Sequence, residues 1–311
     1  MLKIGIIDYI NALPFLAAFK SGAVSFPAQF VLGVPSALNR ALRRGDLDIS
    51  MISSAEFLHM PQRYALIPPY CIGASDKVMS VALYTRLPLK ELDGALVAVT
   101  GQSSTSVELL RLLCTHYWKI NPHFTIFSGN AIDIAKLPAC PAFLLIGDEC
   151  LQNPHFPGYT TVDLAQAWHL ATGLSFVFAV FAANSAERAV HIAENLTDDS
   201  QKNTSVLGSE RISSQVTKAE LAEFSHALGQ ALDWAKKNPA LIHQMAIEKS
   251  RLSPEIISAY FQVLQHTMTP QHMQGLEKFR ALSSMHTTGQ IPPEEPEGSE
   301  KQLEHRNGHV H

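Results

Sequence analysis

The sequence is poor in cysteine, and it contains no long hydrophobic run. Four cysteines occur among 311 residues, and none of them forms a Cys-x-x-Cys pair. This spacing is not that of a disulfide framework, so a reduced, cytoplasmic chain is the better fit. No apolar stretch approaches the roughly 20 residues that a membrane helix requires. The sequence therefore predicts a globular protein that neither depends on disulfides nor spans a membrane.

Charge is also scarce, and neither sign dominates. Charged residues make up 17% of the chain, with 24 Lys and Arg against 28 Asp and Glu, for a net charge of −4. A basic surface for nucleic acid or anionic membrane is thus not indicated. The first residues run directly into a strand pattern without the features of a signal peptide. We expect a cytoplasmic protein without nucleic-acid or membrane partners, and no pattern predicts its oligomeric state.

Common catalytic and metal-binding motifs are missing as well. The sequence contains no His-Glu-x-x-His, no Gly-x-Ser-x-Gly and no Walker loop. The closely spaced pair His309 and His311 lies in a segment rich in Pro, Glu and Gly, for which we expect disorder rather than a structural metal site. We therefore predict no metal and no cofactor.

The chain does contain short strands that end in small polar residues, and the most marked of these is Gly94–Val99. A hydroxyl-rich turn follows this strand and leads into a helix, which Thr105 and Glu108 would begin as a capping box. Side-chain hydroxyls and free N–H groups at a helix start can bind an anion without Lys or Arg. An ordinary cap and turn would explain the same residues. The candidate residues are Ser103, Ser104, Thr105 and Ser106.

Other strands end in the same way. The polar residues are Asn11 after Leu2–Ile7, Ser53 and Ser54 after Leu47–Ile52, and Gly147 and Asp148 after Ala142–Ile146. Open α/β sheets bind their ligands at the carboxyl ends of their strands, although turns and caps use the same residue types. Ser80 differs because it lies within an expected apolar strand, Val78–Thr85, where a buried hydroxyl needs a backbone or ligand partner.

The remaining pattern predicts the domain organisation. The apolar run Phe176–Ala182 is expected to be a strand that returns to the first part of the chain, and Leu196–Gln215 a polar loop. Three amphipathic helices are expected at Lys218–Lys237, Pro239–Lys249 and Pro254–His266. We predict one lobe from residues 1–85 and 180–284, a second from 86–179, and a disordered tail at 285–311.

Taken in order, these motifs resemble one enzyme family on a type II periplasmic-binding-protein-like fold. The family is that of the chorismate dehydratases (MqnA-type) of the futalosine route to menaquinone. Ser175 stands where this family usually has Pro, and Phe181 where it usually has Trp. The matching segments are Tyr9–Pro14, Gly45–Ser50, Ile52–Ser54, Ser80–Val81, Ser103–Ser106, Leu144–Asp148, Asp163–Leu164, Trp168, Thr172–Leu174 and Phe176–Ala179.

The resemblance implies two α/β lobes joined by crossing hinge strands, with a cleft in which chorismate loses water to give 3-[(1-carboxyvinyl)oxy]benzoate. No His or Lys falls in the matched segments, so we expect a substrate carboxylate to take the proton. Asn11 and Ser80 would then be the catalytic residues that hydrogen-bond the reacting substituents. The residues implied to bind substrate are Ser53, Ser54, Ser103, Ser104, Thr105, Ser106, Gly147, Asp148 and Phe178. A cytosolic protein that binds or senses a small anion is the alternative on the same fold.

Overall fold

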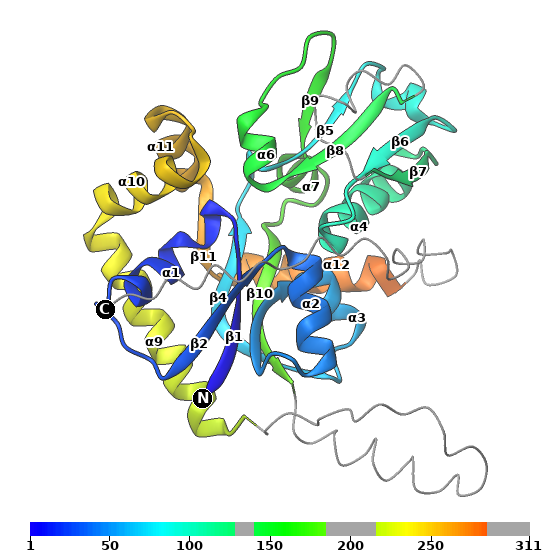
Figure 1. Cartoon of the computed structure of the whole chain (residues 1–311). Coiled ribbons are helices and arrows are strands. Elements are labelled where there is room, and N and C mark those ends of the chain that lie inside the picture. The colour runs from blue at the N-terminus through cyan, green and yellow to red at the C-terminus, as the bar shows by residue number, and fades with distance from the viewer. Residues whose placement is uncertain (128–139, 185–215, 285–311) are drawn as a thin grey trace, which may run out of the picture.

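The computed structural model describes residues 1–127, 140–184 and 216–284, and it contains two mixed β-sheets, each flanked by helices (Figure 1). The expected loop at 196–215 and the expected tail at 285–311 lie outside the described residues. The first sheet has the strand order β11-β4-β10-β3-β1-β2. Its strands are β1 (Leu2–Ile7), β2 (Ala28–Gly33), β3 (Ile49–Ser53), β4 (Tyr64–Ala74), β10 (Phe176–Asn184) and β11 (Leu264–Thr267).

The second sheet has the order β7-β6-β8-β5-β9. Its strands are β5 (Val81–Thr85), β6 (Leu96–Val99), β7 (His123–Ile126), β8 (Ala142–Ile146) and β9 (Thr160–Asp163). In the first sheet β1 pairs in parallel with β2 and β3, while β10 runs antiparallel to β3 and β4, and β11 antiparallel to β4. In the second sheet β6 pairs in parallel with β7 and β8, while β5 runs antiparallel to β8 and β9. We call each sheet with its own helices a half of the molecule.

Helices cover the first sheet on both sides, with α2 and α3 on one flank and α1 and α9 on the other (Figure 1). Helices of the first half are η1 (Ile10–Ala12), α1 (Leu13–Lys20), α2 (Pro35–Arg44), α3 (Ser54–His59), α9 (Lys218–Lys237), α10 (Pro239–Ser250), α11 (Pro254–Val263) and α12 (Pro270–Ser284). Those of the second half are η2 (Leu89–Leu92), α4 (Ser104–Leu112), the π-helical η3 (Leu113–Trp118), α6 (Gly147–Gln152) and α7 (Leu164–Thr172). Within the described ranges, none of these helices has the length and apolar composition needed to cross a membrane.

The strands at the centre of each sheet form the core. All residues of β3, β5 and β8 are buried, as are all residues of β10 except Asn184. Short, continuously apolar strands are expected where helices cover both faces of a sheet, and this is the pattern by which these strands were predicted.

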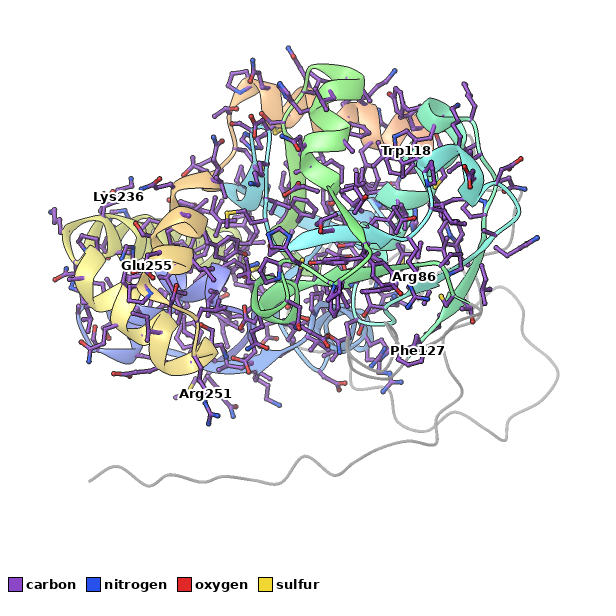
Figure 2. The ribbon with its side chains drawn as sticks, turned by 90° about the horizontal axis from the view of Figure 1, so that it is seen from above. Arg86, Trp118, Phe127, Lys236, Arg251 and Glu255 are labelled. Atoms are coloured by element: carbon purple, nitrogen blue, oxygen red, sulfur yellow. The ribbon has the colours of Figure 1, made fainter. Side chains whose placement is uncertain are left out.

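The two halves lie at opposite ends of the molecule when it is seen from above. Lys236, Arg251 and Glu255 mark the outer end of the first half, and Arg86 and Trp118 mark the outer end of the second half (Figure 2).

The chain crosses between the sheets after β4 and again after α7. The first crossing leads into β5, and the second leads into β10, the return strand predicted at Phe176–Ala182, which the structure confirms. Because β5 pairs with β8 and β9, the segment predicted as 1–85 includes one strand of the second sheet. The crossing itself therefore ends before Val81, not after Thr85.

Three local predictions were wrong in detail. The cap of α4 is Ser103, whose hydroxyl accepts a hydrogen bond from the Ser106 N–H at 3.3 Å, so the helix begins at Ser104 and Thr105 is not its cap. Ser80 lies in a bend just before β5 rather than within a strand. The expected helix Pro254–His266 ends at Val263, because the next residues pair with β4 as strand β11.

Candidate active site

A pocket lies between the two halves, at the carboxyl ends of β1, β3 and β8 and the amino-terminal parts of β5 and β10. About 470 Å³ of space free of protein atoms lies among its lining residues, and part of this space is open to solvent. The edges of both sheets contribute, as expected where ligands bind to open α/β sheets. The lining residues are Ile7, Tyr9, Asn11, Pro35, Ser53, Ile72, Val78, Ser80, Val81, Ser103, Ser106, Ile146, Gly147, Phe178 and Ala179.

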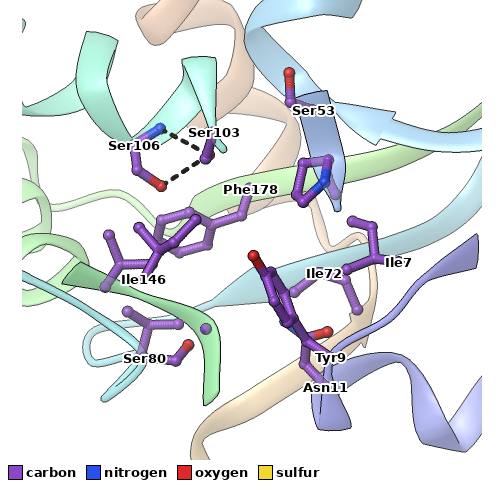
Figure 3. Close-up of a pocket in the computed structure, with 15 residues that line it drawn as sticks. Ile7, Tyr9, Asn11, Ser53, Ile72, Ser80, Ser103, Ser106, Ile146 and Phe178 are labelled. Atoms are coloured by element: carbon purple, nitrogen blue, oxygen red, sulfur yellow. Dashed lines mark hydrogen bonds between the residues drawn. The ribbon is translucent and has the colours of Figure 1, made fainter. Parts of the chain in front are cut away.

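Seven of the predicted site residues come together around this pocket, although they lie far apart in the sequence. Figure 3 shows Ser103 and Ser106 on one side of the space, Phe178 behind it, and Tyr9, Asn11 and Ser80 on the opposite side. The seven are Asn11, Ser53, Ser80, Ser103, Ser106, Gly147 and Phe178.

The other four predicted residues do not line the pocket, and each is hydrogen-bonded elsewhere. The Ser54 hydroxyl donates to the backbone oxygen of Val177 at 2.7 Å. Ser104 shares a hydrogen bond of 2.9 Å with Ser53, and Thr105 accepts from the Ala55 N–H at 2.9 Å. Asp148 accepts from the Ile10 N–H at 3.1 Å. The bonds of Ser104, Thr105 and Asp148 join one half of the molecule to the other.

The start of α4 provides the hydroxyl-rich wall of the pocket. The hydroxyls of Ser103 and Ser106 lie 3.1 Å apart, and Ser103 also accepts the Ser106 N–H (Figure 3). The positive end of the helix dipole reinforces the attraction of this wall for negative charge. No lining residue has a formal charge. An anion in the pocket would therefore be held by hydroxyl groups and by the dipole of α4.

Asn11 lies in η1 with 8% of its surface exposed, and its backbone and side chain face different environments. The side-chain oxygen is buried and has no hydrogen-bond partner among the described residues. The backbone oxygen lies 2.8 Å from Nε2 of His266. Burial lowers the pKa of His266 to about 4, so the ring is neutral at pH 7 and its Nε2–H donates to Asn11. The backbone of Asn11 is thus held in place while its side-chain oxygen remains available to a ligand.

Ser80 is held in place by two hydrogen bonds of its own and by hydrogen bonds of the two residues before it. The Tyr260 hydroxyl donates to its Oγ at 2.9 Å, and its backbone oxygen accepts from the Gly147 N–H at 2.7 Å. The preceding residue, Met79, has a φ of 64°, which is unusual for a residue with a side chain. The Asp163 carboxylate stabilises this bend by accepting the N–H groups of Val78 at 3.1 Å and Met79 at 2.6 Å. The short segment before β5 is therefore fixed from both halves.

Tyr9 lines the pocket but was not predicted as a site residue. Its hydroxyl donates to Oε1 of Gln102 at 2.9 Å, which links the two halves. Burial, followed by the charge of Asp148, raises the pKa of Tyr9, so the phenol stays protonated. The signal available in the sequence was its position two residues after the first strand and two residues before Asn11.

The carboxylates near the pocket are occupied by structural contacts. Glu56 forms an ion pair of 2.7 Å with Arg43 and accepts the Tyr64 hydroxyl at 2.6 Å. Asp163 caps α7 in addition to holding the Ser80 segment. Burial raises the pKa of Asp148, which opposes its ionisation. Among the described residues, no group of three or more His, Cys, Asp or Glu side chains is placed to hold a metal ion.

The chain matches a known protein family and a curated enzyme in sequence. The sequence pattern of a protein family described as menaquinone biosynthesis matches residues 2–206 and 200–284 of the chain. A curated chorismate dehydratase of Thermus thermophilus is 33% identical over 165 residues, which represent 48% of this chain and 59% of the relative. The chain thus spans somewhat more than half the length of the curated relative that it matches.

Solved structures identify the fold. Protein AF1704 of Archaeoglobus fulgidus superposes with a TM-score of 0.68 at 15% identity, covering 91% of this chain and 97% of that one. The CA3427 gene product of Candida albicans, described as having the generic periplasmic binding protein fold, gives a TM-score of 0.61 at 11% identity, covering 93% and 92%. The predicted fold class, a periplasmic-binding-protein-like α/β fold, is therefore confirmed. Because the family pattern extends over nearly all of the described chain, the chain belongs to the menaquinone biosynthesis family.

Proposed function

We propose that this protein is a chorismate dehydratase, a carbon–oxygen lyase that converts chorismate to 3-[(1-carboxyvinyl)oxy]benzoate and water in the futalosine route to menaquinone. Membership of the menaquinone biosynthesis family and the identity to a curated chorismate dehydratase support this reaction. The expected cytoplasmic location, and the absence of any metal or cofactor requirement, are part of the same proposal.

The observation that supports the proposal most directly is the composition of the pocket wall. Chorismate has two carboxylates, and the lining offers hydroxyl groups, an amide and a helix N-terminus but no acidic side chain that would repel them. Ser103 and Ser106 would hold one carboxylate at the start of α4. The apolar side chains of Ile72, Ile146 and Phe178 would cover the faces of the ring. A pocket of this kind suits a dianion with an apolar ring.

The reaction removes a proton from one ring carbon and hydroxide from the next, and the ring becomes aromatic. A base must take the proton, yet no carboxylate is among the pocket-lining residues: Glu56 and Asp163 are engaged in structural contacts, and Asp148 and Glu149 do not line the pocket. The second carboxylate of the substrate is then the base. The proton and the hydroxide leave together as water, so no protein group has a net gain or loss of a proton.

In this mechanism the protein accelerates the reaction by positioning and by fixed dipoles. The unpartnered Asn11 oxygen and the Ser80 hydroxyl both lie on the pocket wall. Placed at the reacting substituents, the Ser80 hydroxyl would donate to the departing hydroxyl group and stabilise the negative charge that develops there, without having to reorganise first. The Asn11 oxygen would accept a hydrogen bond from the substrate and so help to orient it.

The test is to mix the purified protein with chorismate and to follow the appearance of the aromatic product by absorbance and mass spectrometry. We expect turnover that does not depend on added metal. The rival function on this fold, a sensor or binding protein for a small anion, predicts binding of chorismate without product. Binding without turnover would therefore refute the enzyme.

A further inference from the structure

The partner of Ser80 comes from a part of the chain that the sequence motifs do not include. Tyr260 lies in α11, 180 residues after Ser80, and is fully buried. Its hydroxyl lies 2.9 Å from Oγ of Ser80, and the phenol is the donor. The hydrogen bond therefore joins a fully enclosed side chain of the C-terminal helices to the wall of the pocket.

The direction of this hydrogen bond determines whether the Ser80 hydroxyl can donate a hydrogen bond into the pocket. A serine hydroxyl has one proton and two lone pairs. Since one lone pair accepts the Tyr260 proton, the Ser80 proton is left for another acceptor, and no described residue accepts it. Ser80 lines the pocket with 2% of its surface exposed, so the remaining acceptor position is in the pocket. Donation by the phenol also polarises the Ser80 hydroxyl and makes it a stronger donor.

The protonation state of Tyr260 supports its role as the donor in the hydrogen bond to Ser80. Burial raises the pKa of Tyr260 and outweighs the opposing effect of the hydrogen bonds with Ser80 and Asn11, so the phenol keeps its proton throughout the physiological pH range. A phenol that stays protonated and is hydrogen-bonded to Ser80 leaves the serine as acceptor towards the protein and donor towards the pocket.

We propose that Tyr260 is a positioning residue that orients the Ser80 hydroxyl as a hydrogen-bond donor towards the departing hydroxyl group of the substrate. This inference rests on the proposed dehydration of chorismate and assigns a role in it to the C-terminal helix α11. Tyr260 does not line the pocket, so it acts through its polar contacts: the hydrogen bond to Ser80, on which this inference rests, and an interaction with the Asn11 side chain. No proton is transferred along the pair, because the water leaves with the substrate's own proton.

The first experiment compares Tyr260→Phe with the parent protein. The variant keeps the aromatic ring and removes only the donor, so we expect kcat to fall on the order of tenfold while KM changes less than about twofold, since substrate binding relies mainly on the other wall. Tyr84→Phe is the matched control, because Tyr84 is also fully buried and its hydroxyl donates to the Asn153 backbone oxygen at 2.7 Å, away from the pocket. We expect it to melt at a lower temperature with parental kcat.

The second experiment is a double-mutant cycle, which separates a positioning role from a loss of stability. If Tyr260 acts through Ser80, Tyr260→Phe has no further effect on kcat in a protein that already contains Ser80→Ala. Losses that multiply, or a parental kcat in Tyr260→Phe alone, overturn the inference while leaving the proposed function intact. A parent protein that makes no aromatic product overturns both.

Discussion

Gly147 shows how a single residue can determine the shape of the pocket. It follows β8 with a φ of 62°, and a Cβ atom at this position would lie 2.9 Å from Cζ of the Tyr9 ring. Two separate requirements, a left-handed backbone and close contact with an aromatic ring, therefore favour glycine here. The ring that rests on Gly147 belongs to the first half, so this contact also brings the two halves together.

Gly147→Ala should therefore disturb both stability and binding. We expect a loss of about 1–2 kcal/mol in the free energy of unfolding from the backbone alone, and a higher KM because the Tyr9 ring must move. Gly158→Ala is the matched control, because Gly158 has a φ of 77° but no heavy atom within 4 Å of its Cβ position. Chemical denaturation and kinetics of both variants measure the difference. An equal KM in the two variants would contradict a role for the Tyr9 contact.

Three substitutions test whether the substrate supplies the base. Asn11→Ala and Ser80→Ala each remove a preorganised hydrogen bond, and we expect kcat to fall about 10²-fold in each. Asp148→Asn keeps the shape of the side chain and its acceptor for the Ile10 N–H, so a smaller loss is expected. The measurement is kcat at saturating chorismate, after each variant has been shown to melt like the parent. An inactive Asp148→Asn together with a nearly normal Asn11→Ala would identify a protein carboxylate as the base.

Among single residues, the sequence predicted the polar residues that line the pocket better than the apolar ones. Asn11, Ser53 and Gly147 could be found because polar residues after a buried strand are conspicuous. Ile72 and Ile146 could not, because an apolar residue at the end of a strand looks the same in the core and in a pocket. Nor could the sequence show that Ser104 and Thr105, in the same short turn as Ser103, hydrogen-bond to the opposite half.

Helix α4 is the element on which substrate binding is expected to depend most. Its cap, Ser103, also lines the pocket. Ser103→Ala should therefore cost about 1 kcal/mol of stability, as other cap removals do, and raise KM for chorismate. Thr217→Ala removes the cap of α9, which does not reach the pocket, so it should lower stability by a similar amount without changing KM. Thermal melts and steady-state kinetics compare the two, and a raised KM in Thr217→Ala would show that lost stability alone explains the effect.

A titratable pair, His59 of α3 and Glu108 of α4, connects these two helices. The Nε2 atom of His59 lies 3.0 Å from the Glu108 carboxylate, and this hydrogen bond, followed by the opposing effect of burial, leaves the pKa of His59 raised. A raised pKa in the folded state adds stability that is complete below the unfolded value of about 6.5 and is lost as the pH rises through the folded value. The pair therefore favours contact between the halves under mildly acidic conditions.

The corresponding prediction concerns the pH dependence of unfolding. Between pH 6 and pH 9, the parent should lose a stability increment that His59→Gln lacks, so the difference between the two proteins should shrink with rising pH. Urea denaturation at several pH values measures this difference. A difference that stays constant, or grows with pH, would contradict the assignment to the His59 and Glu108 pair.

The order of the elements was largely predictable, because buried strands and amphipathic helices have distinct periods. The strand at Ala142–Ile146 and the helix at Lys218–Lys237 have the predicted bounds. Strand β11 was missed because its four residues continue the pattern of α11, and only pairing with β4 makes them a strand. Tertiary contacts of this kind are not visible in local periodicity.

At the scale of the whole molecule, contacts between the halves narrow the pocket, although part of it is open to solvent. The side chains of Ser53, Ser80 and Ser103 are less than 10% exposed, although they line the pocket. Hydrogen bonds from Tyr9 to Gln102 and between Ser53 and Ser104 close it on the side of α2 and α4. These contacts narrow the entrance for a ligand the size of chorismate. We therefore propose that the halves move as two lobes about the crossings before β5 and β10, and that closure accompanies binding.

A reversible crosslink between the halves tests this motion. The hydroxyl oxygens of Ser53 and Ser104 lie 2.9 Å apart, so a double variant with Ser53→Cys and Ser104→Cys should form a disulfide across the closed pocket. The native cysteines are all buried, and burial raises the pKa of Cys71, Cys114 and Cys150 to about 12, so they should react poorly with a mild oxidant.

We expect the oxidised double variant to take up chorismate at least about tenfold more slowly than its reduced form, because the slow step becomes the opening that the disulfide prevents. Reduction should restore uptake, and each single substitution should be insensitive to oxidant, which separates the crosslink from changes to the pocket wall. Stopped-flow binding measures all four proteins. Since the same protein is compared before and after reduction, equal uptake rates could only mean that chorismate reaches the pocket without separation of the halves.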